Sequence, residues 1–411
     1  MTSQDRKPDL SAKFFIAFLV ALFSLFPFTT IIDFGTYTQP YALLIAIAFI
    51  PFAFNIPLGL ASYAALCWLF FYGIVLYGYT TIDEPFMSSI KYIIAYITPL
   101  LVVPPAFYLA RHHKAFFLKL MQVSLFLWIG VAIIQIMFFP SFMTFLVGSW
   151  ASAAEVVVQS GRGVISLAPE PTTFGFHLII VGAIFYLLSG KYHLSAVLAS
   201  GSLFLAGSAS SVLVVLLAIG LGIIGQIRFK FFAKVIFIGL PFVVVIGFLV
   251  SSILNFENLL GFRVIELVLL AIESPEVLLL DASVNSRLGG LYVAIVECFD
   301  RAFSPFGLSL VDWLIEIDLL LEKYPFINDL STSGFPSGYF IQLYQGGFLF
   351  LPVLLYMFFK ATKVWKFPPN ERWLVLSAIL IPMFQFSFAI PTFWLFWGVY
   401  LERLLTSSNY R

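Results

Sequence analysis

Long apolar segments follow one another along most of this 411-residue sequence, and they restrict its fold more than any other feature. About twelve of them are long enough to cross some 30 Å of hydrocarbon as helices. They cover residues 14–32, 41–57, 59–79, 91–110, 116–139, 172–189, 194–208, 211–227, 234–254, 338–359, 373–390 and 392–405. Only 10% of the residues are charged, against about a quarter in soluble domains, and the mean hydropathy is +1.01. The sequence therefore predicts an all-α polytopic membrane protein with about 12 transmembrane helices in a lipid bilayer.

The charged residues divide unevenly between the two sides of this arrangement. Sixteen of the 22 lysines and arginines fall on the side of the amino terminus, while 17 of the 21 acidic residues fall on the other side. Lysine and arginine near the ends of spans stay in the cytoplasm, so both termini are predicted to be cytoplasmic. The net charge is +1 without a basic stripe, which gives no reason to expect a nucleic-acid partner.

Two segments on the acidic, outer side are too long to be simple turns. One covers residues 140–171 and the other covers 255–337. The chain thus divides into nine spans with the first outer loop (1–254), a large outer loop (255–337) and three final spans (338–411). Loops of this length in a compact protein usually carry function, so we expect the functional residues there.

The large outer loop is predicted to be helical. Residues 285–303 and 310–324 place apolar side chains at helical spacing, with acidic side chains on the opposite face. Such helices either lie on the membrane surface or pack within an extracytoplasmic cap, and the pattern is compatible with both.

Two outer arginines are candidates for binding an anion. Arg162 lies between two glycines in QSGRGVISLAPEP, and Arg287 lies in NSRLGG near the start of a predicted helix. Flanking glycines let a ligand approach the backbone, and a guanidinium presents a fork of donors that matches phosphate oxygens. Together the two arginines would hold a diphosphate. Alternatively, each arginine pairs with one of the outer carboxylates.

Glu170 stands between Pro169 and Pro171, directly before an apolar span. A proline suits the first turn of a helix, and the helix dipole favours a carboxylate just ahead of that turn, so a capping role is one interpretation. The second proline also stiffens the approach. A rigidly held carboxylate there would serve as a general base or fix a substrate-binding arginine.

Several function classes leave no trace in the sequence. The chain has no phosphate-binding glycine loop and no histidine, cysteine or carboxylate pair at metal-ligand spacing, so neither a metal nor another cofactor is predicted. Charged residues are almost absent from the predicted spans, although ion-coupled carriers usually need them there.

Three stretches, in this order, resemble motifs of the O-antigen polymerase and ligase superfamily. GRGVISLAPEPTTFGFHL at 161–178 is similar to its "R-G … E-P-(S/N/T)-x-x-G" segment ahead of a span. NSRLGGLYVAIVECFDRAFSPFGLSL at 285–310 resembles its large-loop arginine, the following helix and a "P-x-G-x-G" turn, here reduced to Pro305-Phe306-Gly307. SGYFIQLYQGGFLFLPVLLY at 337–356 is similar to the segment that re-enters the membrane after the loop. Three motifs in order, with matching topology, form a fairly specific pattern.

The resemblance implies a metal-independent, GT-C-like integral-membrane glycosyltransferase with a helical periplasmic loop domain. It would act on glycans carried by undecaprenyl diphosphate at the periplasmic face of a bacterial inner membrane. By matching position, Arg162 and Arg287 would bind the donor's diphosphate, while Glu170 would lie on the acceptor side or support an arginine. The further residues predicted to bind substrate from these motifs are Asn285, Ser286, Tyr339 and Gln342. Arginines can stabilise the charge of the leaving diphosphate without a metal.

One departure from the family pattern favours a polymerase. The ligases carry a loop histidine near "H-(S/N)-x-x-L", where this chain has STSGFPS at 331–337. The predicted function is therefore polymerisation of lipid-linked repeat units of O-antigen or a related surface polysaccharide, with donor and acceptor glycans and a chain-length regulator as expected partners. The alternatives are an O-antigen ligase, a lipid-linked oligosaccharide flippase, a peptidoglycan polymerase and a purely structural membrane protein. The long loop argues against a flippase.

Overall fold

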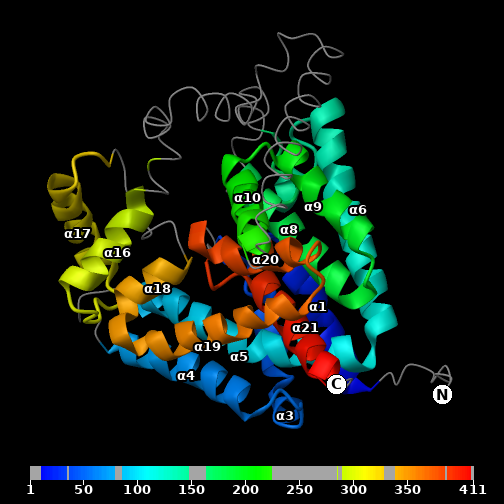
Figure 1. Ribbon diagram of the computed structural model, residues 1–411, viewed down its shortest axis with the longest axis horizontal. Helices are drawn as coiled ribbons and strands as arrows, with labels where there is room; N and C mark the ends of the chain where they lie inside the picture. Colours follow the sequence, from blue (N-terminus) through cyan, green and yellow to red (C-terminus); the bar gives the residue numbers. More distant parts are fainter. Residues whose placement is uncertain are drawn as a thin grey trace.

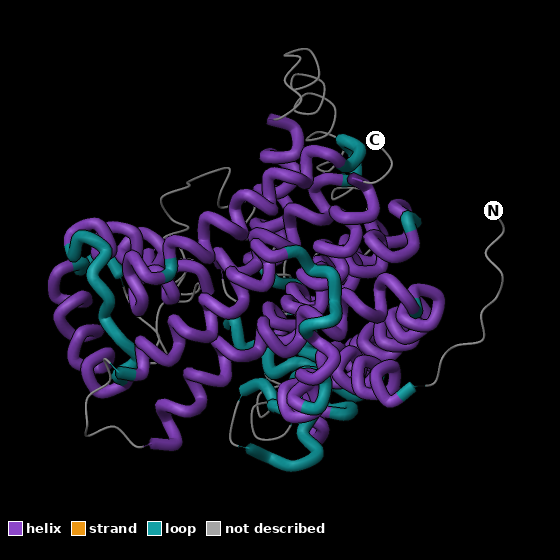
Figure 2. The backbone as a smooth tube through the Cα atoms, turned by 90° about the horizontal axis from the view of Figure 1, so that it is seen from below, coloured by secondary structure: helices purple, strands orange, loops and turns teal. Residues whose placement is uncertain are grey.

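The computed structural model describes residues 11–34, 37–78, 86–147, 163–224, 285, 289–327, 338–384 and 387–408. All regular secondary structure within these ranges is helical, which confirms the predicted all-α class (Figures 1 and 2). The α-helices are α1 (Ala12–Leu25), α2 (Tyr41–Ile47), α3 (Ile50–Ala53), α4 (Leu60–Tyr77), α5 (Phe86–His112), α6 (Lys114–Met137), α8 (Pro171–Ser189), α9 (Tyr192–Ala206), α10 (Ala209–Ile224), α16 (Gly290–Asp300), α17 (Leu310–Lys323), α18 (Gly338–Gly346), α19 (Leu351–Ala361), α20 (Arg372–Phe384) and α21 (Pro391–Ser408). Short 3-10 helices cover Thr144–Leu146, Gly347–Leu349 and Thr362–Lys366.

The helices follow the predicted apolar segments, but fewer of them reach spanning length. Within the described ranges, three helices are long and apolar enough to cross a membrane, namely α4, α6 and α8. Shorter apolar helices occupy Ala12–Leu25, Ser210–Gly222 and Arg372–Phe384. The structure therefore supports a helical chain with three clear candidate spans in place of about twelve. The segment predicted at 234–254 lies outside the described residues.

Prolines divide two of the predicted spans. A proline inside a helix lacks an N–H group and its ring clashes with the carbonyl four residues earlier. Pro51 therefore conflicts with a helical carbonyl at Ile47, where α2 ends, and α3 begins separately at Ile50. The segment 338–359 likewise separates into α18 and α19. Gly347, with φ +51°, follows the end of α18, and Pro352 occupies the first turn of α19.

Helix α8 forms the centre of the molecule. Its residues from Thr172 to Leu188 are all buried, and it packs against α6, α9, α20 and α21. A helix that is apolar on all sides is either buried in protein or faces lipid, and α8 is buried in protein. Its limits are set locally, because Pro171 suits the first turn and Gly190, with φ +71°, ends the helix in the left-handed conformation. The start of α8 is therefore firmly placed, and with it Glu170.

The carboxyl end of α1 is completed by side chains from distant helices. The last carbonyls of a helix lack partners within it. The Thr392 hydroxyl of α21 donates to the Ser24 carbonyl, and the Trp128 indole of α6 donates to the Leu25 carbonyl at 3.0 Å. Both acceptors lie in the buried core, so these bonds tie α1, α6 and α21 together.

Helices α16 and α17 confirm the two helices predicted in the large loop, and they lie on the opposite side of the molecule from α6 (Figure 1). The Ser309 hydroxyl caps α17 by accepting a hydrogen bond from the Asp312 amide at 3.1 Å. Trp313 of α17 packs against Phe306 and against Tyr344 of α18. The side of α17 that carries Trp313 is thus covered by protein, whereas Leu314, Ile315 and Leu319 of the same helix are exposed.

Candidate functional site

Glu170 is the N-cap residue of α8, with extended backbone angles of φ −150° and ψ 157°. Its side chain makes no capping hydrogen bond to the helix, although capping was one interpretation of the sequence. The carboxylate oxygen Oε1 instead accepts hydrogen bonds from the Tyr37 hydroxyl at 2.9 Å and from the Thr173 hydroxyl at 3.5 Å. Glu170 is only partly buried. The Glu170 carboxylate therefore accepts hydrogen bonds from hydroxyl groups at the amino-terminal end of the central helix α8.

Tyr37 reaches Glu170 from the connection between α1 and α2. Its hydroxyl also lies 2.8 Å from the Thr173 hydroxyl, and its ring packs edge-on against Phe28 with centroids 5.8 Å apart. The backbone amide of Gln39 donates to the Pro27 carbonyl at 2.8 Å, which folds this connection back on itself. These contacts fix the direction from which the hydroxyl approaches the carboxylate.

A second group of hydroxyls lies beside Glu170, where α9 ends and α10 begins. The Ser208 hydroxyl donates to the Thr172 hydroxyl at 3.1 Å and accepts from the Ser211 amide at 3.4 Å. The amino-terminal ends of α8 and α10 therefore meet, and the dipoles of both helices favour negative charge there. We call Tyr37, Glu170, Thr172, Thr173 and Ser208 the Glu170 cluster.

Glycines permit this close meeting of helices. A Cβ on Gly175 would lie 2.4 Å from the Ser211 hydroxyl oxygen, so α8 and α10 approach closely only because residue 175 has no side chain. Gly163 has φ +83°, and a Cβ there would lie 2.3 Å from the Ala206 carbonyl oxygen. The amide of the next residue, Val164, donates to the Leu205 carbonyl at 3.0 Å. One of the two glycines beside Arg162 is thus needed for packing against the end of α9.

The segment that leads to Glu170 is held by a side chain of α6. The buried Gln135 amide accepts from the Ser166 backbone N–H at 2.7 Å and donates to the Ser166 carbonyl at 3.1 Å. The Ser166 hydroxyl donates to the Trp128 carbonyl at 2.7 Å. Ser166 has φ +53°, which a residue other than glycine rarely adopts, and these bonds stabilise that conformation. The carboxyl-terminal end of α6 therefore supports the approach to Glu170.

The other residues predicted from the sequence occupy different surroundings. Arg162, Ser286 and Arg287 lie outside the described residues. The buried Asn285 donates from its amide to the Phe326 carbonyl at 2.8 Å, close to the end of α17. The Tyr339 hydroxyl donates to the Ile379 carbonyl of α20 at 3.0 Å.

Gln342 of α18 differs from these two residues. It is 6% exposed, and its backbone carbonyl accepts from the Tyr72 hydroxyl at 2.8 Å. Its side-chain oxygen Oε1 is buried and has no hydrogen-bond partner among the residues that the structure describes. Buried acceptors are usually paired, so this amide is available to a polar ligand that reaches α18. The structure thus brings together partners for Glu170, while Asn285, Tyr339 and Gln342 belong to the neighbourhood of α16, α18 and α20.

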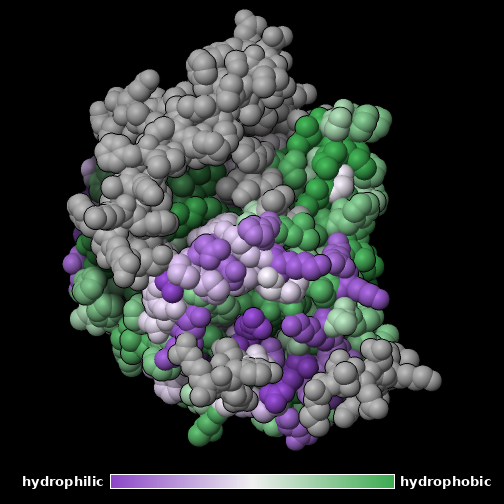
Figure 3. All heavy atoms as spheres, turned by 45° about the vertical axis from the view of Figure 1, so that its right-hand side comes forward, coloured by the Kyte–Doolittle hydropathy of each residue, from purple (hydrophilic) through white to green (hydrophobic). Residues whose placement is uncertain are grey.

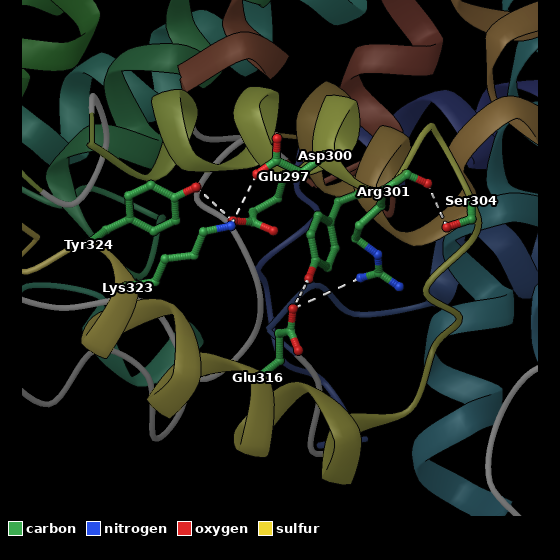
Figure 4. Close-up of polar contacts among 8 residues, drawn as sticks. Glu297, Asp300, Arg301, Ser304, Glu316, Lys323 and Tyr324 are labelled. Atoms are coloured by element: carbon green, nitrogen blue, oxygen red, sulfur yellow. Dashed lines mark hydrogen bonds and ion pairs between the residues drawn. The ribbon is translucent and has the colours of Figure 1, made fainter.

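A second polar network joins α16, α17 and α18 (Figure 4). The Lys323 ammonium lies 2.7 Å from the Glu297 carboxylate and 3.1 Å from the Asp300 carboxylate, and the Tyr324 hydroxyl donates to Glu297 at 2.7 Å. The hydrogen bonds that the Lys323 ammonium donates to Glu297 and Asp300 raise the pKa of Lys323. Burial, followed by the bond to Glu297, raises the pKa of Tyr324. The network fastens the end of α17 to α16.

The same loop contains an arginine held by protein groups. The Arg301 guanidinium lies over the rings of Phe306 and Tyr344, 4.9 and 5.0 Å from their centroids. One of its nitrogens is 4.0 Å from the Glu316 carboxylate, which also accepts from the Tyr344 hydroxyl at 2.6 Å (Figure 4). This is the carboxylate pairing considered for the outer arginines, realised at Arg301. Its role is to hold α17 against α18.

Sequence reasoning did not identify the hydroxyl partners of Glu170. Tyr37 is 133 positions away, and nothing near it in sequence indicates the contact. Ser208 did carry a signal, because the polar run SASS at 208–211 interrupts two apolar segments beside the span that begins at Pro171. Among the described residues, no three histidine, cysteine or acidic side chains are grouped as metal ligands.

Comparison with family models, with curated proteins and with solved structures gave no match to this chain.

Proposed function

We propose that this chain is an integral-membrane glycosyltransferase that polymerises oligosaccharide repeat units carried on undecaprenyl diphosphate. It would act at the periplasmic face of a bacterial inner membrane and join O-antigen or related surface-polysaccharide units. The proposal combines the three sequence motifs with the geometry around Glu170. A protein that sets chain length is its expected partner, and the bilayer supplies both lipid-linked substrates.

The observation that supports this proposal best is the hydroxyl-lined carboxylate at the start of α8. Glu170 accepts a hydrogen bond from the Tyr37 hydroxyl at 2.9 Å and remains partly exposed. An ionised carboxylate accepts hydrogen bonds on two oxygens, which makes it the kind of group that orients a sugar hydroxyl. Thr172 and Ser208 provide further hydroxyls beside it, joined at 3.1 Å. This set of groups suits a polyol ligand.

In the proposed reaction, a hydroxyl oxygen of the acceptor glycan attacks the anomeric carbon of the donor glycan. The bond between that carbon and the diphosphate oxygen breaks, and the lipid diphosphate leaves with the bonding electrons. Glu170 orients the attacking hydroxyl and accepts its proton as the new bond forms. Arg162 and Arg287 stabilise the charge that develops on the leaving diphosphate.

The position of Arg162 in the sequence fits this division of roles. Arg162 precedes Gly163, which packs against the Ala206 carbonyl at the end of α9. Ser208 of the Glu170 cluster follows two residues after Ala206. The proposal therefore places the diphosphate and the acceptor hydroxyl on neighbouring sides of the amino-terminal end of α8.

Deletion of the gene in its source bacterium tests the function directly, with surface polysaccharide separated on a gel. Loss of a polymerase leaves lipid A core with at most one repeat unit, which is the expected result. Complete absence of O-antigen from the core would identify a ligase instead. Repeat units trapped in the cytoplasm would identify a flippase, and an unchanged ladder would contradict all three functions.

Single substitutions test the assigned residues. Arg162→Ala and Arg287→Ala are expected to reproduce the deletion while the protein still inserts in normal amount. Lys191→Ala, which removes an exposed cation after the opposite end of α8, serves as the control and should leave the ladder unchanged. Full-length ladders from both arginine variants would contradict the proposed diphosphate site.

A further inference from the structure

A groove of about 320 Å³ runs along α6 where this helix passes α8 and α9. Its walls include Phe126, Ile129, Gly130 and Ile133 from α6, Phe185 from α8 and Leu194 from α9. Its only polar lining residue is Gln122, which lies nearest the start of α6. The side of the molecule where α6 lies is mostly hydrophobic (Figure 3). The groove is therefore an apolar channel on an apolar face.

Gly130 gives the groove its depth. A Cβ at this residue would meet no atom within 4 Å, so the missing side chain leaves open space in place of a close helix contact. Phe126 stands one turn before it and Ile133 one turn after it, because residues three and four apart share a helix face. The helix thus has a notch with a large apolar side chain on either side.

The shape of the groove suits a single hydrocarbon chain. From Gln122 to Ile133 the helix rises about 16 Å, at 1.5 Å for each residue. The lining offers no acceptor or donor along this length except at the Gln122 end, so a polar headgroup would lose its hydrogen bonds there. An extended apolar chain loses none.

The groove leads to the Glu170 cluster. Ile133 lies at one end of the groove, and Gln135 follows it after a single residue in α6. Gln135 binds both backbone groups of Ser166, at 2.7 and 3.1 Å, and the chain then continues to Glu170. A hydrocarbon chain lying in the groove therefore has one end at Ile133, next to the segment from Ser166 to Glu170 that carries the proposed reaction site.

We propose that this groove binds the polyisoprenyl chain of the lipid-linked substrate, with the diphosphate at the Ile133 end. This inference rests on the proposed function, which requires a substrate whose diphosphate carries one long hydrocarbon chain. A phospholipid brings two chains and is a poorer match to a groove for one. A polyisoprenyl chain bound in the groove would thus bring its diphosphate to the Glu170 cluster from the Ile133 end of α6.

Photo-crosslinking of the full-length protein in lipid nanodiscs tests the inference. The probe is a benzophenone-tagged polyprenyl diphosphate, and the labelled peptides are identified by mass spectrometry. We expect labelling within residues 122–133 or 185–194, competed by untagged undecaprenyl diphosphate and not by an equal concentration of phosphatidylglycerol. Equal competition by phosphatidylglycerol would overturn the proposal, because the groove would then be a general lipid contact.

Filling the notch provides the matched variant. Gly130→Leu introduces a side chain into open space, so it should fold normally and reduce groove labelling at least about tenfold. Gly220→Leu in α10, another position where a Cβ meets nothing within 4 Å, is the control and should label as the unaltered protein does. Unchanged labelling of Gly130→Leu would contradict the inference.

The two proposals fail in distinguishable ways. If Gly130→Leu labels normally while Glu170 variants still lose the polysaccharide ladder, the groove assignment is wrong and the polymerase proposal stands. If gene deletion leaves the ladder unchanged, the polymerase proposal is wrong, and the groove assignment that rests on it falls as well.

Discussion

The hydroxyl of Tyr37 and the carboxylate of Glu170 lie 2.9 Å apart, although 133 positions separate them in the sequence. The contact joins the α1–α2 connection to the mouth of α8. The contact fixes the position of the Glu170 carboxylate at the surface of the bundle, because the hydroxyls of Tyr37 and Thr173 both donate to its Oε1 atom.

Tyr37→Phe should lower polymerising activity about tenfold while the protein accumulates normally. The substitution removes one hydrogen bond to a carboxylate, worth about 1.5–3 kcal/mol, and a loss near 1.4 kcal/mol corresponds to a factor of ten. Activity is measured as the rate of chain extension in membrane vesicles. Tyr41→Phe is the control, because the Tyr41 hydroxyl belongs to the same connection and bonds to the backbone of Ile31 and Ile32. An equal loss in both variants would assign the effect to the connection as a whole.

Glu170→Gln and Glu170→Ala should both abolish chain extension. Since the carboxylate makes no capping bond to α8, neither change removes a helix cap, and both variants should still fold. The amide keeps an acceptor for Tyr37 and loses the basic oxygen. A Gln variant with full activity would show that Glu170 is not the proton acceptor.

Gln135→Leu should destabilise the protein by about 2–6 kcal/mol. The buried N–H and carbonyl of Ser166 would both lose their partner, and each unpaired group costs roughly 1–3 kcal/mol. The apparent free energy of unfolding is measured in detergent by denaturant titration. Gln122→Leu, an exposed glutamine of the same helix, should change it by less than about 0.5 kcal/mol.

Cys298 should react slowly with iodoacetamide at pH 8 and much faster above about pH 10. Burial raises the pKa of this thiol to about 11, and only the thiolate reacts. The rate therefore increases with pH up to about 11 instead of levelling near 9. The measurement uses a Cys67→Ser background, because the exposed Cys67 would otherwise react as well. A rate that levels off below pH 9 would contradict the buried position of Cys298.

The sequence predicted those elements that depend on local signals. Residues 172–189 and 310–324 became α8 and α17 because a proline or serine starts each helix and apolar spacing continues through it. The segment 41–57 was less well predicted, since its mean hydropathy hides the break before Pro51. Hydropathy averages over a window, while helix ends depend on single residues.

The candidate site was predicted only in part for a similar reason. Glu170 could be singled out because its position before Pro171 is a local feature. Tyr37 and Gln135 could not, because their contacts join segments far apart in sequence and involve residue types that are common in this chain. Arg162 and Arg287 stay predictions, since they lie outside the described residues.

The bonds at the end of α1 also determine when the bundle can be completed during synthesis. Ser24 obtains its hydroxyl partner from Thr392, 368 positions later, so α1 is synthesised long before that partner has been translated. Until α21 arrives, this carbonyl at the end of α1 depends on another donor such as water, because the helix itself supplies none. The last helix thus completes the packing of the first. In a nascent chain that stalls before α21, the carboxyl end of α1 would stay hydrated and accessible to quality-control proteases.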